Sequence, residues 1–278
     1  MEKTSLKIKA MYNSMSRSDK QIADWINKNP GKIISLSIVD LSEECGCSEA
    51  TIVRFAKKLG LSGYQELKIS LASEGSSLPI NSNISQNDAP FDIYQKICTD
   101  VYLSFEKTKK SLDPKNFEMA CKKIMSADKI VVFGLGNSAS VAIDASHKLL
   151  RAGLNSVAYN DNHMQVIAAS HLSKNDVAIA ISHSGSSKDI VDAIKLAREH
   201  GATTIAITNA GKSELLKCTD IPLFTSADET KYSILALNSR IVQLAIIDAI
   251  YHYIVLNNSD KALESIKETE RSLLNKKY

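Results

Sequence analysis

The stretch Asp176–Ser187, DVAIAISHSGSS, decides the fold of this chain. Residues 176–181 form an apolar run of strand length. A run without polar alternation is typical of a strand that is buried on both faces of a parallel sheet covered by helices. After the polar residues, Ile190, Ile194 and Ala197 fall on one helical face. The hydroxyl-rich turn is therefore expected to join the carboxyl end of a buried strand to the amino end of a helix.

Three hydroxyls in this turn follow the spacing i, i+2 and i+5, at Ser182, Ser184 and Ser187. Gly185 allows close approach of the backbone. Helix amino ends bind anions because free N–H groups and the positive end of the helix dipole point outward. The pattern predicts a phosphate-binding turn. The alternative is a polar turn whose serines only cap the helix.

On either side of this stretch, strand and helix patterns alternate. Expected strands are residues 129–133, 156–159, 176–181, 203–208 and 221–224, with helices at 139–151, 164–172 and 190–200. Pro222 favours an edge position for the last strand. Five strands with helical crossovers predict an α/β doubly wound, mostly parallel five-stranded sheet.

The turn after the first strand, Gly134–Ser138, partly matches a dinucleotide-binding fingerprint. It has two glycines, but Ala139 stands where the third is expected. The second strand ends in Tyr159 and Asn160, with no carboxylate until Asp161, whereas a ribose-binding site needs an acidic residue there. Nicotinamide binding is therefore not expected. The two turns are predicted to face one small ligand together.

The first seventy-five residues show helical patterns and no strand pattern. Ser18 is the expected cap of a helix that carries Ile22 and Ile26. A short helix with Leu41 on its inner face follows, and Gly46 makes the turn to the next helix. Two short helices joined by a glycine turn are typical of a helix-turn-helix.

In the second helix of this motif, Ser48 is the expected cap, and Ile52, Phe55 and Leu59 face inward. The residues left available to solvent or a DNA groove are Glu49, Ala50, Thr51, Arg54, Lys57 and Lys58. The segment from Ser48 to Lys68 carries a small positive excess. DNA binding and an ordinary solvated helix face both fit this charge. The next segment is expected to be another capped helix and not a β wing.

A polar, Ser- and Asn-rich stretch at 76–90 reads as a linker. The predicted domains are therefore an all-α helix-turn-helix domain at 1–75 and a second domain at 91–278. The second domain is expected to open with helices at 91–110 and 116–125.

Composition is that of a globular protein, with 278 residues, 44% of them apolar, and a formal net charge of +3. The five cysteines are odd in number and lack the spacing of a zinc site, so reduced thiols in the cytoplasm are expected. No signal peptide is expected at the amino end. Residues 234–256 are apolar enough to span a bilayer, but they carry a polar residue about every turn. A buried helix that packs between subunits is predicted instead.

With these residues in view, the chain resembles the RpiR/MurR family of bacterial transcription regulators. The amino-terminal part is similar to their helix-turn-helix at Ser48-x-x-Thr51-x-x-Arg54-Phe55 and at Lys57–Gly60 followed by Gly63-Tyr64-x-Glu66-Leu67-Lys68. The remainder resembles a sugar isomerase (SIS) domain at Gly134-x-Gly136-x-Ser138, at Ser182-x-Ser184-Gly185-x-Ser187, and at Ser239-Arg240-x-x-Gln243-Leu244 followed by Asp248.

The resemblance implies that the two hydroxyl turns hold the phosphate of a phosphosugar effector. The effector residues it implies are Gly136, Asn137, Ser138, Ser182, Ser184, Gly185, Ser187 and Glu229. His183 is expected to be structural. On the DNA side the implied contacts are Ser48, Thr51, Arg54, Lys57, Lys58 and Lys68.

The function expected from this resemblance is transcriptional regulation of carbohydrate metabolism genes, through operator DNA and a phosphosugar, in a homodimer or homotetramer. No catalytic residue, metal or cofactor is expected. The alternative is an aldose–ketose phosphate isomerase with an added helical domain. Glu229, His183 and His252 are its candidate acids and bases. A third reading is a sugar-binding protein that acts through protein partners.

Overall fold

The computed structural model describes residues 3–29, 32–33, 36–74, 84–85, 87–227 and 237–276. The chain forms two compact units. The first comprises Met1–Asp100, Gly211–Ser213 and Asp228–Leu237, and the second comprises Val101–Ala210, Glu214–Ala227 and Asn238–Tyr278. The domain limits predicted at residues 75 and 91 stay predictions.

The amino-terminal unit is helical in its described part. Its first five helices are α1 (Thr4–Met11), α2 (Arg17–Lys28), α3 (Ile38–Cys45), α4 (Glu49–Lys58) and α5 (Tyr64–Ser73). Residues from all five build one core, with Ile8, Ile22, Leu41, Phe55 and Leu67 fully or almost fully buried. This confirms the prediction of short helices around a shared apolar centre.

Helix α2 begins earlier than predicted, so Ser18 is not its cap. Ser16 is the cap residue, because its hydroxyl accepts the Asp19 N–H and the Asp19 carboxylate accepts the Ser16 N–H in return. This reciprocal pair satisfies two N–H groups that a helix start leaves without partners.

Helices α3 and α4 form the predicted helix-turn-helix. Gly46 ends α3, and the Ser48 hydroxyl caps α4 by accepting the Thr51 N–H. Helix α5 follows, as predicted in place of a wing, although its first residue is preceded by Gly63 and no side chain caps it.

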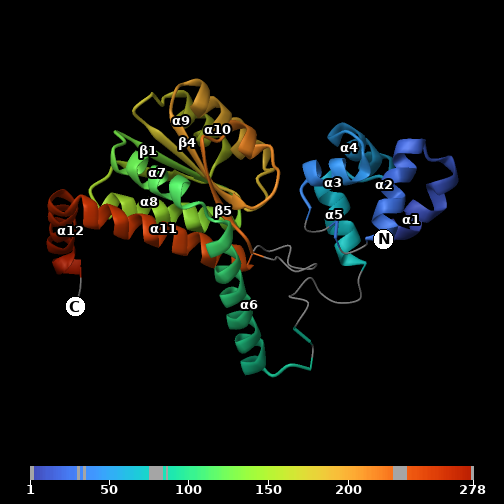
Figure 1. Ribbon diagram of the computed structural model, residues 1–278, viewed down its shortest axis with the longest axis horizontal. Helices are drawn as coiled ribbons and strands as arrows, with labels where there is room; N and C mark the ends of the chain where they lie inside the picture. The colour runs from blue at the N-terminus through green and yellow to red at the C-terminus, as the bar shows by residue number, and fades with distance from the viewer. Residues whose placement is uncertain are drawn as a thin grey trace. The chain divides into compact units, whose positions relative to one another are not determined.

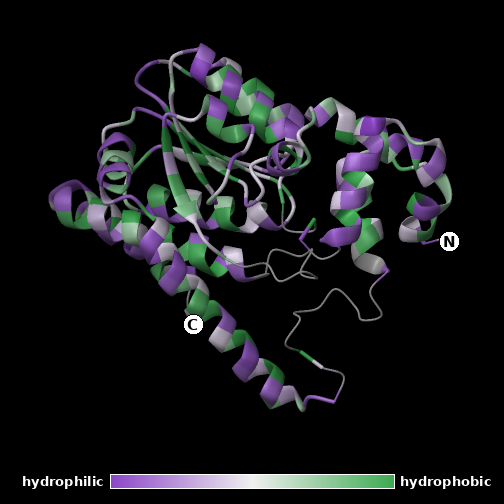
Figure 2. Ribbon diagram, turned by 45° about the vertical axis from the view of Figure 1, so that its right-hand side comes forward, coloured by the Kyte–Doolittle hydropathy of each residue, from purple (hydrophilic) through white to green (hydrophobic). Residues whose placement is uncertain are grey.

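The second unit contains the sheet. Its strands are β1 (Ile130–Gly134), β2 (Ser156–Tyr159), β3 (Val177–Ile181), β4 (Thr203–Asn209) and β5 (Ile221–Thr225). They lie in the order β2-β1-β3-β4-β5, and every neighbouring pair is parallel. The strands are largely hydrophobic (Figure 2). The predicted doubly wound sheet is confirmed, with the Pro222-containing strand at an edge.

Helices cover both faces of this sheet (Figure 1). One face packs against helices α7 (Pro114–Met125), α8 (Asn137–Arg151) and α11 (Leu237–Asn257). The other packs against α9 (Asn162–Ser170), α10 (Lys188–Glu199) and the short 3-10 helix Leu215–Cys218. Successive strand residues point to opposite faces, so Val132 and Val131 belong to different cores.

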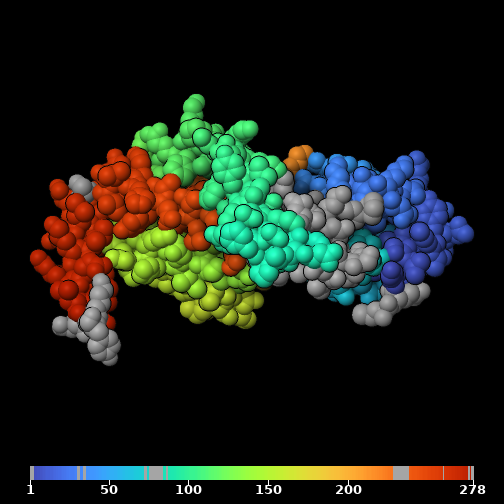
Figure 3. All heavy atoms as spheres, turned by 90° about the horizontal axis from the view of Figure 1, so that it is seen from below, coloured from blue at the N-terminus to red at the C-terminus, as the bar shows by residue number. Residues whose placement is uncertain are grey.

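Helix α11 corresponds to the apolar stretch that the sequence analysis assigned to a buried helix. It lies between α7 and α8 (Figure 3), and its Val242, Ile246, Ile250 and Ile254 side chains are buried. Within the described residues it is the one helix long and apolar enough to cross a membrane, with a mean hydropathy of 1.3. Packing against the sheet accounts for its buried face, as in the core helix of a globular domain.

Two further α-helices and two short 3-10 helices, Tyr12–Ser14 and Leu274–Lys276, complete the described chain. Helix α6 (Pro90–Ser111) precedes α7, and α12 (Ser259–Leu273) follows α11. Helix α12 contacts α8, where the Arg151 guanidinium lies 2.6 Å from the Glu270 carboxylate.

Candidate functional site

The two hydroxyl turns lie at the point where the strand order reverses. Strands β1 and β3 are neighbours, and their last residues, Gly134 and Ile181, are directly paired. The chain leaves β1 toward the α8 face and leaves β3 toward the α10 face. In open α/β sheets this divergence forms a crevice outside the carboxyl ends of the strands, where ligands bind. The two turns therefore start at the same level on adjacent strands, and that they face one ligand together stays a prediction.

The first turn passes directly into α8. Gly136 is the residue before the helix and has a φ of 56°. This left-handed region favours glycine because it has no side chain. The helix starts at Asn137, earlier than the predicted start at Ala139, so both Asn137 and Ser138 belong to its first turn. The Ser138 N–H donates to the Leu135 carbonyl, 3.1 Å away.

The second turn is anchored by the neighbouring strand β4. The His183 carbonyl accepts the Asn209 N–H at 3.0 Å and the Thr208 hydroxyl at 3.3 Å. The Gly185 carbonyl accepts the Leu215 N–H at 3.0 Å. Thr208 is not among the predicted site residues, although a hydroxyl at the carboxyl end of a predicted strand is a usable signal.

Four serine hydroxyls of the two turns remain available to donate to a ligand. Among the described residues, no hydrogen bond joins the side chains of Ser138, Ser182 or Ser187 to another residue. Ser184 is exposed and its Oγ accepts the Ser186 N–H at 3.3 Å, which leaves the hydroxyl proton free to be donated. Ser182 is 5% exposed.

The alternative that these serines only cap the helix does not hold for Ser187. Ser187 is the residue before α10, but its side chain makes no capping hydrogen bond. The first N–H groups of α10 are therefore not satisfied by this hydroxyl. A phosphate at this position gains hydrogen bonds from helix N–H groups and from hydroxyls, and it gains from the helix dipole.

Two other predicted residues, Glu229 and His183, do not add an available hydroxyl to the two turns. Glu229 lies outside the described residues. His183 is half-buried, and its backbone carbonyl is the anchor of the second turn. Lys188 and Asp189 follow the turn as exposed residues of opposite charge.

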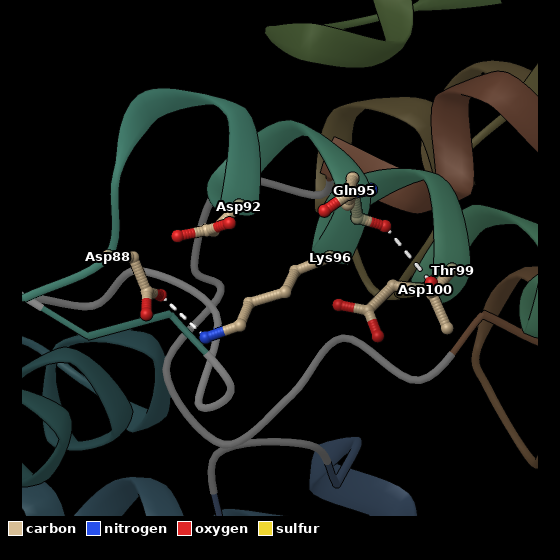
Figure 4. Close-up of a pocket in the computed structure, with 6 residues that line it drawn as sticks. All are labelled: Asp88, Asp92, Gln95, Lys96, Thr99 and Asp100. Atoms are coloured by element: carbon tan, nitrogen blue, oxygen red, sulfur yellow. Dashed lines mark hydrogen bonds and ion pairs between the residues drawn. The ribbon is translucent and has the colours of Figure 1, made fainter.

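A separate hollow of 330 Å³ lies along the first turns of α6 (Figure 4). Its lining residues are Asp88, Asp92, Gln95, Lys96, Thr99 and Asp100. The Lys96 ammonium lies 2.6 Å from the Asp88 carboxylate, which lowers the pKa of Asp88. Three carboxylates around a paired lysine repel a phosphate, so this hollow does not suit an anionic ligand.

The exposed face of α4 is smaller than predicted. Arg54, Lys57 and Lys58 are exposed, and Ala50 lies on the same side. The expectation that Thr51 is available is wrong. Thr51 is 8% exposed because it shares the inward face with Phe55, and its hydroxyl lies 2.9 Å from the Ser48 hydroxyl.

The side chains of Lys58 and Lys68 interact with other residues of the helical unit. The Lys58 ammonium lies 2.6 Å from the Asp19 carboxylate, which is almost fully buried. The Lys68 ammonium donates to the Leu36 carbonyl at 2.9 Å and lies 5.5 Å from the centre of the Tyr64 ring. Their DNA contacts stay predictions, as do those of Ser48, Arg54 and Lys57.

Comparison with known protein families finds two domains in the chain, a helix-turn-helix and a SIS domain. Residues 3–77 match the helix-turn-helix domain of the rpiR family, and residues 123–253 match the SIS domain. An uncharacterised HTH-type transcriptional regulator of Caldanaerobacter subterraneus subsp. tengcongensis is 35% identical over 96% of this chain and 95% of its own length. HexR, an HTH-type transcriptional regulator of Pseudomonas aeruginosa, is 32% identical over 98% of this chain and 95% of its own.

Among solved structures, the NanR protein of Vibrio vulnificus in complex with ManNAc-6P has the same fold. Its TM-score is 0.84 at 23% identity, over 99% of this chain and all of the NanR chain. The fold and the relatives define a regulator with a helix-turn-helix followed by a SIS domain. The chain belongs to the rpiR family of HTH-type transcriptional regulators.

Proposed function

We propose that this regulator of carbohydrate metabolism genes binds operator DNA through α4 and responds to a phosphosugar held by the two hydroxyl turns. The observation that carries the proposal is the pairing of Gly134 with Ile181. It places the turns that lead into α8 and α10 at the ends of adjacent strands, with three hydroxyls that have no hydrogen-bond partner among the described residues. NanR, the neighbour of like fold, was solved with a phosphosugar.

Catalysis is not part of the proposal. An aldose–ketose isomerase needs an acid and a base beside the reacting carbons. Of the candidates, His252 follows Asp248 on α11, and Asp248 pairs with Lys148. Lys148 lies about 16 Å along α8 from its amino end. His252 is thus remote from the crevice. Turnover of phosphosugars by the purified protein that is lost in Glu229→Gln would favour the isomerase.

The proposed assembly is a homodimer or homotetramer in the cytoplasm. A helix-turn-helix usually reads two half-sites about 34 Å apart, which requires two copies. On the second unit, apolar side chains remain exposed on neighbouring helices α8 and α11, including Ile143, Leu150, Ile241 and Leu256. A second copy would cover them.

The proposal is tested by measuring DNA binding to a random library of genomic fragments, with and without sugar phosphates. Selective retention of particular fragments, and a change in that affinity with a phosphosugar but not with its unphosphorylated form, is expected. Binding without sequence preference, or an unchanged affinity with every phosphosugar tried, would contradict the DNA or the effector part respectively.

A further inference from the structure

Gln165 in α9 is a fully buried polar side chain beside the first hydroxyl turn. Its exposed fraction is 0%. Its Nε2 lies 2.8 Å from the Tyr159 carbonyl oxygen and 3.4 Å from the Gly134 carbonyl oxygen. Tyr159 is the last residue of β2, and Gly134 is the last residue of β1. One amide group therefore donates to the carboxyl ends of two adjacent strands.

The orientation of this amide follows from its neighbours. Reversing it would bring its oxygen against two carbonyl oxygens, so the nitrogen must face them. Its Oε1 is then buried without a hydrogen-bond partner among the described residues. A buried acceptor without a partner costs free energy that an apolar side chain would avoid. The two donated hydrogen bonds are thus the specific contribution of Gln165.

The position of Gly134 affects the position of the first hydroxyl turn, because Gly134 is closely packed against the start of α8. A Cβ added at Gly134 would lie 2.7 Å from the Ser138 carbonyl oxygen and 3.0 Å from the Ala142 Cβ. The end of β1 is therefore packed directly against the first turns of α8. Because protein interiors are close-packed, a shift of Gly134 moves Ser138 with it.

We propose that Gln165 is a positioning residue of the phosphate-binding crevice. By holding the Gly134 and Tyr159 carbonyls from the α9 side, it fixes the start of the first hydroxyl turn against the end of β2 and against α9. It acts through Gly134 and Ser138 and touches no ligand, because no part of it reaches the surface. The inference rests on the proposed function, and it gives α9 a part in effector binding.

The test compares Gln165→Met with Thr204→Val by calorimetric titration of the full chain. Methionine keeps the length of the side chain and removes the amide. Thr204 is a matched control because it too is fully buried and hydrogen-bonded, with its hydroxyl 3.0 Å from the Cys218 carbonyl oxygen and 2.8 Å from the Asp220 carboxylate. Thr204 is the second residue of β4, which lies toward the β5 edge of the sheet and away from β2. Probes are glucose 6-phosphate, N-acetylmannosamine 6-phosphate and inorganic phosphate.

Gln165→Met is expected to bind about tenfold more weakly than wild type, because a displaced turn loses aligned contacts. The loss should be equal for the phosphosugar and for inorganic phosphate. Thr204→Val should bind like wild type even where its melting temperature falls as far. Equal affinity in Gln165→Met, equal losses in both variants, or a loss confined to the phosphosugar would each overturn the proposal.

Probe binding by the wild type distinguishes a failure of the proposed role of Gln165 from a failure of the proposed function. If the wild type binds none of the probes, the phosphosugar proposal falls and the role of Gln165 falls with it. If the wild type binds and Gln165→Met does not fold, NMR on the wild type decides. The side-chain amide resonances of Gln165 should then shift together with the backbone amide resonance of Ser138 on adding the probe. Unshifted Gln165 resonances would overturn the role.

Discussion

At the scale of the residue, the serines of the second turn differ in whether their hydroxyls already have a hydrogen-bond partner within the protein. Ser186 bonds back to its own loop, with its Oγ 3.1 Å from the Ser184 carbonyl. Ser182 and Ser187 have no such partner among the described residues. The serines at i, i+2 and i+5 are thus the ones whose hydroxyls remain available, and Ser186, whose hydroxyl donates to the Ser184 carbonyl, is not among them.

Ser184→Ala is expected to weaken effector binding by about 1.5–3 kcal/mol, or ten- to a hundredfold. The reason is that the phosphate loses one charge-assisted hydrogen bond at a helix amino end. DNA binding without effector should be unchanged, while the effector response shifts to higher concentration. Titrating DNA affinity against sugar phosphates measures this shift.

Ser186→Ala is the matched control, because it removes a hydroxyl from the same loop. It should leave the effector concentration for half response within about twofold of wild type. If Ser184→Ala and the wild type respond at the same effector concentration, Ser184 does not hold the phosphate.

Asp19 gives the helical unit a measurable pH dependence. Burial raises the pKa of Asp19, but hydrogen bonds from Lys58 and Ser16 and the charge of Lys58 outweigh it and hold the pKa below its ordinary value. In the unfolded chain, the Asp19 carboxyl has a pKa of about 3.9. Stability from this group is therefore present above that pH and is lost as the pH falls through the lower folded pKa.

The free energy of unfolding of the wild type should accordingly fall between about pH 5 and pH 3. Asp19→Asn removes this titration, so its stability should depend less on pH in that range. Urea unfolding of both proteins, followed by the single tryptophan Trp25 of the helical unit, measures the difference. Parallel pH profiles would contradict the assignment.

At the scale of the element, α4 divides its basic residues between two tasks. Lys58 ties α4 to α2 through Asp19, whereas Lys57 is exposed and no ion pair joins it to another described residue. Arg54 is exposed too, and its guanidinium lies 3.4 Å from the Thr51 hydroxyl. Arg54 and Lys57 are therefore the side chains of α4 that DNA can reach without breaking an ion pair.

Arg54→Ala is expected to weaken operator binding without loss of folding. If Arg54 reads a guanine, discrimination at one base pair falls by about 1–3 kcal/mol; if it holds a phosphate, affinity falls uniformly across sequences. Lys57→Ala should reduce the salt dependence of binding by about one phosphate contact. Fluorescence anisotropy with operator variants at several salt concentrations separates these cases.

Lys58→Ala provides the contrast within the same helix. It should lower the melting temperature of the helical unit, because a buried carboxylate loses its cation. Unchanged operator affinity in a folded Arg54→Ala protein would reject the contact altogether.

At the scale of the whole molecule, apolar surface remains uncovered in the second unit. Helix α11 buries one side against the sheet, yet Ile241 is 40% exposed and Leu256 is 77% exposed. Large exposed apolar patches in a globular protein mark interaction sites. A second copy of the chain is the partner that a palindromic operator would require.

Sedimentation at micromolar concentration should therefore show at least a dimer. Ile241→Glu, which places a charge on the exposed side of α11, should shift the protein toward the monomer and weaken operator binding in parallel. Lys195→Glu, at an exposed residue of α10, is a control charge change away from this helix. A stable wild-type monomer would contradict the assembly.

The sequence alone predicted the helix-turn-helix, all five strands and the two hydroxyl turns. Each of these rests on local patterns: apolar periodicity, a glycine in a turn, and runs of strand residues without alternation. The cap of α2 was misplaced because Ser16 and Ser18 are both capping residues by type, and only the bond to Asp19 distinguishes them.

Only the tertiary structure decided which polar residues are free. Thr51, Lys58 and Lys68 look available from the sequence. The Thr51 hydroxyl lies beside that of the cap residue Ser48, Lys58 pairs with Asp19 of another helix, and Lys68 donates to the Leu36 carbonyl ahead of α3. Gln165 gave no signal in sequence, because its role depends on two strand ends that are distant in the chain. Periodicity determines which face of an element is buried, whereas hydrogen-bond partners are set by which elements become neighbours.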